Sequence, residues 1–176
     1  SAQTILAANA GLSDAIELRL QPAPPQVLFG LLREGERFDF SLCNPPFHSS
    51  AQAALEGTRK KWKKLRKDGH GARLNFGGLG GELWCPGGEE AFARRLIREI
   101  SELHTLCFWF STLISKAASL PSVYRTLKQT GALATRTLDM AQGQKQSRLV
   151  GWTFLSDAQR REWRGERWGG HHSPDL

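Results

Sequence analysis

Asn44, Pro45, Pro46 and Phe47 are the residues of this sequence whose types and order are best suited to chemistry. The Asn44 amide oxygen and the Pro45 carbonyl oxygen can each accept a hydrogen bond from a planar NH₂ group. The Phe47 ring can stack on the plane that carries this group. The four residues therefore predict a site that binds an exocyclic amine and presents its nitrogen for methylation.

The element before these residues decides whether they form a site or an ordinary turn. Residues 38–43 (FDFSLC) are short, apolar and aromatic, which predicts a buried strand. Two consecutive prolines then prevent both a continuing strand ladder and an immediate helix. Ligands of open α/β sheets bind at the carboxyl ends of strands, so this position favours a binding site. Asn-Pro-Pro alone is also common in simple turns, which remains the alternative.

Basic residues are concentrated in one segment between Gly57 and Gly81, where Asp68 is the only acid. This segment accounts for the whole net charge of +7. Its basic residues are Arg59, Lys60, Lys61, Lys63, Lys64, Arg66, Lys67 and Arg73. Such a concentration predicts binding to a polyanion, with a merely solvated basic loop as the alternative.

The length and composition predict one globular domain without a membrane segment. The chain has 176 residues, of which 40% are hydrophobic and 23% are charged. No apolar run approaches the ~20 residues that span a bilayer, and no signal peptide is recognisable. Cys43, Cys85 and Cys107 are widely spaced and suggest neither a disulfide framework nor a zinc site, and we expect no metal at His171 and His172. These features favour a cytoplasmic protein.

The amino-terminal half is predicted to alternate helices and strands. We expect a helix over residues 1–9, a strand over 16–20, a loop over 21–26 and a short helical segment over 27–33. A helix begins near residues 49–55, and residues from about 57 to 83 form a flexible basic insertion.

The carboxyl-terminal half completes an α/β architecture. Helices are predicted at residues 89–103 and 120–130, and strands at 105–111, 134–140 and 149–155. No helical pattern separates the last two strands, so they should pair antiparallel as a hairpin. Trp109, Phe110, Trp152 and Phe154 are expected in the core. We assign residues 1–163 to the domain, including a short charged helix from residue 156, and 164–176 to a disordered tail.

Several runs of residues together resemble one enzyme family, the bacterial large-subunit ribosomal RNA adenine-N6 methyltransferases. The eukaryotic U6 small nuclear RNA adenine methyltransferase is a more distant relative. The resemblance extends from Ser1 to about Arg161. The runs that carry it are CNPPFH at 43–48, NFGG at 75–78, ELWC at 82–85, GGE at 87–89, WFSTL at 109–113, MAQGQKQSR at 140–148 and WTF at 152–154.

This resemblance implies an S-adenosylmethionine-dependent enzyme with a Rossmann-like sheet whose last strand is antiparallel. It further implies methyl transfer to N6 of an adenine in 23S ribosomal RNA, free or in a large-subunit precursor. Asn44 and the Pro45 carbonyl would bind the N6 amino group, Phe47 would stack on the base, Pro46 completes the catalytic motif, and Asn44 also touches the cofactor. The RNA phosphates would meet Arg59, Lys60, Lys61, Lys63, Lys64, Lys145 and Arg148.

One departure from the family pattern concerns the cofactor. A Gly-rich turn after the first strand and an acid ending the second are both missing, so the chain corresponds to a sheet without its first two strands. No general base is evident, because Asp39 lies inside a strand and His48 is expected in an exposed turn.

Two other functions are compatible with these residues. A protein glutamine N5-methyltransferase would use a similar Asn-Pro-Pro-aromatic site, although RNA explains the basic segment better. A non-catalytic RNA-binding module would explain the missing Gly-rich strand.

Overall fold

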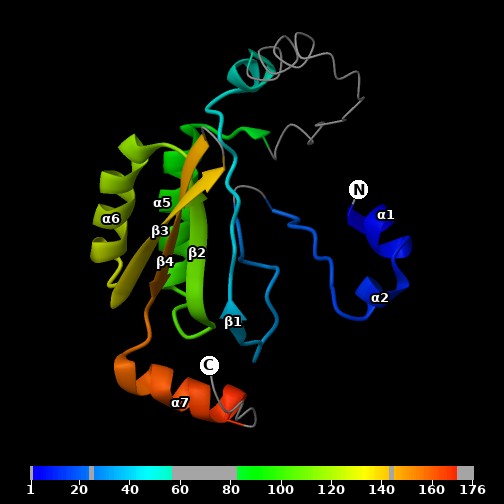
Figure 1. The fold of residues 1–176 in the computed structure, drawn as a ribbon, viewed down its shortest axis with the longest axis vertical. Helices are drawn as coiled ribbons and strands as arrows, with labels where there is room; N and C mark the ends of the chain where they lie inside the picture. The colour runs from blue at the N-terminus through cyan, green and yellow to red at the C-terminus, as the bar shows by residue number, and fades with distance from the viewer. Residues whose placement is uncertain (1, 24–25, 57–82, 143–144, 170–176) are drawn as a thin grey trace. The chain divides into compact units, whose positions relative to one another are not determined.

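The computed structural model describes residues 2–23, 26–56, 83–142 and 145–169 (Figure 1). They belong to two compact units, Ser1–Glu36 and Arg37–Leu176. The predicted basic insertion at 57–82 and the chain from 170 onward lie outside the described residues. In the described ranges, every helix is too short or too polar to cross a bilayer.

The first unit contains two short helices, α1 (Ala2–Ala7) and α2 (Ala10–Ser13), and the first of them confirms the helix predicted there. The strand predicted at 16–20 is wrong, because this segment pairs with no other strand in the described part of the chain. Alternation of apolar and charged residues does not make a strand unless a partner supplies the ladder. The helical segment predicted at 27–33 is also wrong, since these residues form turns.

The second unit is built on a four-stranded sheet in the order β1-β2-β4-β3. Its strands are β1 (Phe38–Phe40), β2 (Cys107–Ile114), β3 (Ala134–Gln142) and β4 (Lys145–Thr153). β1 runs parallel to β2, whereas β4 runs antiparallel to both β2 and β3. The predicted hairpin and the antiparallel last strand are therefore confirmed.

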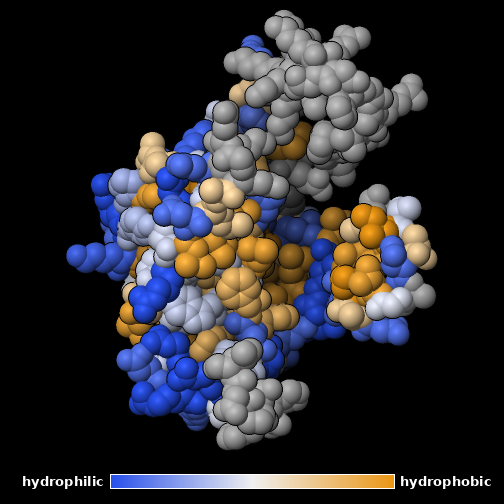
Figure 2. Space-filling model, viewed as in Figure 1, coloured by the Kyte–Doolittle hydropathy of each residue, from blue (hydrophilic) through white to orange (hydrophobic). Residues whose placement is uncertain are grey.

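β1 is shorter and less buried than the sequence predicts. It spans three residues instead of six, and its Phe40 is 55% exposed. The reason is that β1 lies at the edge of the sheet, where only β2 pairs with it in the described residues. Figure 2 shows the resulting exposure of apolar residues over the sheet, whereas the surface around the last helix is hydrophilic.

Two amphipathic helices, α5 (Gly88–Ser101) and α6 (Leu120–Gln129), contribute buried residues to the core of the second unit, together with the strands. Gly131 follows α6 with φ of 80°, a backbone conformation that favours glycine after a helix. The core prediction holds for Phe110, Trp152 and Phe154, which are at most 9% exposed. Trp109 is half-buried instead, because alternate residues of β2 face opposite sides of the sheet.

The last helix, α7 (Asp157–Trp168), is docked on the first strand of the sheet. It begins with a capping box in which Ser156 and Gln159 bond reciprocally. Trp163 is 2% exposed and donates from Nε1 to Asp39 Oδ1 at 2.8 Å, as does Arg167 Nε at 2.9 Å. The helix continues to Trp168, five residues beyond the end predicted for the domain. Asp39 lies inside a strand, as predicted, and its carboxylate bonds α7 to β1.

Asp39→Asn should weaken the docking of α7 in a pH-dependent way. The hydrogen bonds from Arg167 and then Trp163 lower the pKa of Asp39 below its ordinary value of 3.8. Its contribution to the free energy of unfolding is therefore present above that value and lost as the pH falls through the lower native pKa. Because the side chain is 41% exposed, we expect a loss of only about 0.2–1 kcal/mol at pH 7.

Urea unfolding followed by tryptophan fluorescence at pH 7 and at pH 3 checks this expectation. The difference between the variant and the parent protein should shrink at pH 3. Asp14→Asn changes an exposed residue of the first unit and is the control. It should leave the free energy of unfolding unchanged at both pH values. A difference of equal size at both pH values would show that the Asp39 charge does not hold the helix.

Candidate active site

The Asn44–Phe47 motif begins where the backbone ladder between the first two strands ends. The Cys43 N–H donates to Ser111 O at 3.1 Å, and the Leu113 N–H donates to Cys43 O at 2.9 Å. Both main-chain groups of the residue before Asn44 are thus fixed by β2. The motif follows the carboxyl end of β1, as predicted, and the structure adds that β2 runs parallel to this segment. Asn44 itself is exposed. Its carboxamide can therefore meet an incoming molecule.

The other end of the motif is held by the segment that leads into α5. The His48 N–H donates to Leu83 O at 3.2 Å, and the Cys85 N–H donates to His48 O at 3.0 Å. Gly88 has φ of +64°, and a Cβ there would lie 3.4 Å from Ser49 N, so the helix begins against the motif's flank. His48 is half-buried in this pairing and is not the exposed turn residue that the sequence predicted. The motif is consequently fixed on both sides.

Pro45 and Pro46 are buried, whereas Phe47 is half-buried and lines a cavity of about 550 Å³. This volume lies within the ~300–1,000 Å³ of small-molecule sites. The cavity is bounded by the motif, the end of β2 and the end of the β3–β4 hairpin. Its lining residues are Phe47, Leu113, Ser115, Met140, Ala141, Gln146 and Ser147. The predicted site lacked the last six of these, and the only signal for the hairpin residues was the run from Met140 to Arg148.

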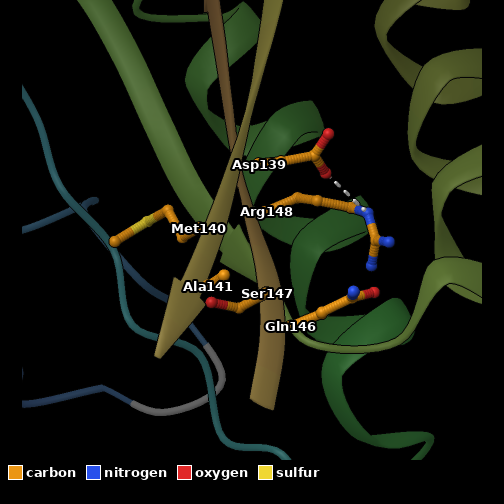
Figure 3. A pocket seen from close by; sticks show the side chains of 6 residues that line it. All are labelled: Asp139, Met140, Ala141, Gln146, Ser147 and Arg148. Carbon is orange, nitrogen blue, oxygen red and sulfur yellow. Dashed lines mark ion pairs between the residues drawn. The ribbon is translucent and has the colours of Figure 1, made fainter. Parts of the chain in front are cut away.

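The hairpin end also borders a smaller cavity of about 220 Å³. Arg148 Nε lies 3.2 Å from Asp139 Oδ1, and the Arg148 side chain is 19% exposed. Figure 3 shows Arg148 and Gln146 pointing to one side of the hairpin and Met140 to the other. The two faces follow from the antiparallel register, in which Met140 pairs with Ser147 and Asp139 with Arg148. The hairpin thus presents an apolar side chain on one face and a cation on the other.

Of the predicted RNA-binding residues, the structure describes the side chain of Arg148 alone, which lines the smaller cavity and not the one that Phe47 lines. The side chain of Lys145 is not described, and Arg59, Lys60, Lys61, Lys63 and Lys64 lie outside the described residues. The structure therefore brings the motif and the hairpin together and is silent on the basic segment.

The ionisable groups around the motif do not provide an obvious acid or base. Burial raises the pKa of the Cys43 thiol and raises that of Cys107 to about 12, so both remain protonated at neutral pH. The cysteines are free, as predicted. Within the described ranges, no group of three His, Cys, Asp or Glu residues could hold a metal ion. What these residues offer is hydrogen-bond acceptors and an aromatic face, which suit binding and orientation of a base.

A family model described as RNA methyltransferase matches residues 1–156. This chain belongs to that RNA methyltransferase family. Two relatives, both called Ribosomal RNA large subunit methyltransferase F, are similar over nearly the whole chain. The protein from Methylobacillus flagellatus is 48% identical over 184 residues, which cover 96% of this chain and 55% of the relative. That from Pseudomonas paraeruginosa is 53% identical over 171 residues, which cover 96% and 51%. The chain thus spans about half the length of these relatives.

A comparison with solved structures supports the fold of this RNA methyltransferase family member. The catalytic domain of human METTL16, in complex with MAT2A 3′UTR hairpin 1, aligns with a TM-score of 0.67 and 26% identity. The alignment covers 89% of this chain and 52% of the human one. The predicted α/β methyltransferase fold and the family resemblance are therefore confirmed.

Proposed function

We propose that these residues belong to an S-adenosylmethionine-dependent enzyme that transfers a methyl group to N6 of an adenine in 23S ribosomal RNA. The observation that carries the proposal is the motif that follows β1, in which Asn44 is exposed and Phe47 lines a cavity. Phe47 is the member of the motif that contributes to the cavity wall. The family membership supports RNA as the substrate, and the names of the relatives support ribosomal RNA of the large subunit.

The acceptors of the motif act on the amino group that is methylated. The exocyclic nitrogen of adenine is a poor nucleophile because its lone pair is delocalised into the ring. Asn44 Oδ1 and Pro45 O accept its two hydrogens and favour the pyramidal nitrogen that forms during transfer, which is stabilisation specific to the transition state. Pro45 and Pro46 restrict the backbone that presents these acceptors. A general base is not required, because the methylated nitrogen can lose its proton to solvent.

The adenine has to leave its stack before it reaches these acceptors. Flipping a base costs a few kcal/mol in a duplex and less in a loop. Stacking of the base on Phe47 returns about 1–3 kcal/mol of this cost. The cavity between Phe47 and the hairpin is where the flipped base would lie, since Phe47 contributes to its wall.

S-adenosylmethionine supplies the methyl group, and Asn44 is the residue of this chain that we assign to its binding. The exposure of Asn44 makes its side chain accessible for this role. A Gly-rich turn and an acidic residue for the ribose hydroxyls are not found in the sequence. The residues present therefore fit only part of a cofactor site. The roles assigned to Pro45 and Phe47 concern the adenine alone.

The remaining parts of the proposal concern the surroundings of the site. Residues 1–163 belong to the methyltransferase domain, and α7 extends it to Trp168. Its partner is 23S ribosomal RNA or a large-subunit precursor in the cytoplasm, and neither a membrane nor a metal takes part. The basic segment and the hairpin residues Lys145 and Arg148 contact RNA phosphates.

A segment exchange tests the proposal despite the shorter length of this chain. These 176 residues would replace the matching segment of the Pseudomonas paraeruginosa relative. We expect this chimaera to transfer labelled methyl groups from S-adenosylmethionine to 23S ribosomal RNA, and a nuclease digest of the RNA to contain N6-methyladenosine. The intact relative is the positive control, and thermal unfolding verifies that the chimaera is folded. A folded chimaera that produces no N6-methyladenosine would refute the proposal.

The same assay separates the two alternative functions. Labelled glutamine in a protein, with no labelled RNA, would identify a glutamine N5-methyltransferase, although the family description favours RNA. Calorimetric titration of S-adenosylmethionine and RNA into the 176-residue chain addresses the second alternative. RNA binding by the chain, combined with an inactive chimaera, would favour a non-catalytic module.

Replacing Lys60, Lys61, Lys63 and Lys64 together by glutamine should weaken RNA binding and reduce its dependence on salt. Each phosphate contact contributes about 0.7–0.9 to the slope of log K against log salt, so the slope should fall by as much as about 3. Fluorescence anisotropy with a labelled 23S fragment at several salt concentrations measures this slope. Replacement of Arg125 and Lys128, which are exposed on α6, by glutamine is the control. An unchanged slope in the fourfold variant would identify the segment as a solvated loop.

A further inference from the structure

Glu89 is a buried carboxylate close to the proposed site for which the proposed mechanism has no role. It is the second residue of α5, and it is only 1% exposed. Burying a carboxylate costs several kcal/mol unless hydrogen bonds and charges compensate. A buried acid beside a binding cavity therefore requires a physical explanation.

The partners of Glu89 lie in the loop that follows β2. Its carboxylate accepts hydrogen bonds from the Ser115 N–H at 2.7 Å and the Lys116 N–H at 3.1 Å. The Ser115 hydroxyl donates to the same carboxylate. The first turn of the helix adds a favourable electrostatic term for an acid at this position. Glu89 thus fixes both the backbone and the side chain of Ser115.

Ser115 links this arrangement to the base, because it lines the same cavity as Phe47 and Leu113. The start of α5 is itself attached to the motif by the His48–Cys85 backbone bond and by the close approach of Gly88 to Ser49. The helix start is therefore held to the Phe47 side of the cavity, and Glu89 holds the Ser115 side to the helix start. One carboxylate connects two walls that come from distant parts of the sequence.

The hydroxyl bond has a further consequence for the ligand. Since the Ser115 proton is donated to Glu89, the Ser115 oxygen can offer only its lone pairs to the cavity. A group of the ligand that meets this oxygen must therefore be a donor, such as an amino or hydroxyl group.

We propose that Glu89 is a positioning residue of the adenine site, which acts through Ser115 by fixing the position and the hydrogen-bonding polarity of the part of the cavity wall that Ser115 forms. This role rests on the proposed function. A shift of the Ser115 loop would move the bound base relative to Asn44. Small shifts of this kind lower the rate of methyl transfer strongly, whereas they do not affect the binding of RNA phosphates elsewhere on the protein.

Glu89→Gln in the active chimaera tests the proposal. The glutamine amide places a donor where three donors already converge, so the loop should shift. We expect kcat to fall about tenfold, as for other residues that orient a group in contact with the substrate. The dissociation constant of 23S ribosomal RNA should stay unchanged. Glu90→Gln is the matched control, because it removes the same charge from the same helix turn and should leave kcat unaltered.

Two further measurements keep the result decisive. Glu89→Asp retains the charge but is one methylene shorter, so it should also lower kcat; full activity of this variant would show that only the charge matters. Hydrogen exchange of the Ser115 and Lys116 amides in the 176-residue chain should become faster in Glu89→Gln. Unchanged kcat in both Glu89 variants would overturn the inference, whereas an inactive parent chimaera would instead refute the proposed function.

Discussion

Asn44→Ala is expected to lower kcat for RNA methylation by about 10²–10³-fold while leaving RNA affinity nearly unchanged. The magnitude is that of removing one hydrogen-bonding group that acts in the transition state. RNA affinity should persist because it depends on contacts with phosphates elsewhere in the molecule. Single-turnover methylation of 23S ribosomal RNA by the chimaera, together with an RNA binding isotherm, measures the two quantities separately.

The exposure of Asn44 makes this variant a clean test, since removal of an exposed amide should not unfold the protein. Gln52→Ala is a suitable control, because it removes another exposed amide from residues 51–56, directly after the motif. It should retain full activity. Turnover by Asn44→Ala at the parent rate would exclude the residue from the mechanism, and loss of RNA binding would assign it to the RNA interface instead.

Phe47→Ala should reduce kcat/KM by up to about 150-fold, because stacking of a base on an aromatic ring is worth about 1–3 kcal/mol. Phe47 is half-buried and forms part of the cavity wall, so the loss combines stacking with a change in the shape of the site. Initial rates at several concentrations of 23S ribosomal RNA give kcat/KM directly.

Two other substitutions of Phe47 separate the ring from its volume. Phe47→Tyr keeps an aromatic face and should retain most of the activity, whereas Phe47→Leu keeps an apolar side chain without a π-face and should behave like alanine. Equal activity of the leucine and tyrosine variants would show that the residue contributes packing only. A stable fold of each variant is verified by its thermal unfolding.

Local patterns predicted the second unit well because its elements pack on one another. The hairpin followed from two predicted strands without a helical pattern between them, and the ladder from Ala134 to Thr153 confirms it. The helix at 88–101 was visible from its spaced apolar residues, which are buried in the structure. In both cases, local pattern and tertiary packing favour the same conformation.

The predictions failed where the conformation or burial of a segment depends on neighbouring strands, which the local sequence pattern does not reveal. The alternating residues 16–20 lack a pairing strand, and the apolar run at 38–43 lies at a sheet edge. The composition of a segment indicates its preference for the strand conformation, whereas its exposure depends on which other elements pack over it. The motif at Asn44 was recognisable because its chemistry is local. The other lining residues of the cavity were not recognisable, because Ser115, Met140 and Ser147 are brought to Phe47 only by the fold.

The hydrogen bonds that fix the two ends of the motif join main-chain groups on both sides. Such bonds do not depend on which side chains the participating residues carry, apart from proline, which lacks the N–H. Substitutions at Cys43 or Leu83, which are half-buried, can therefore accumulate without breaking these main-chain bonds. Relatives can drift far apart in sequence and still inherit the same framework, as the shared fold at 26% identity illustrates.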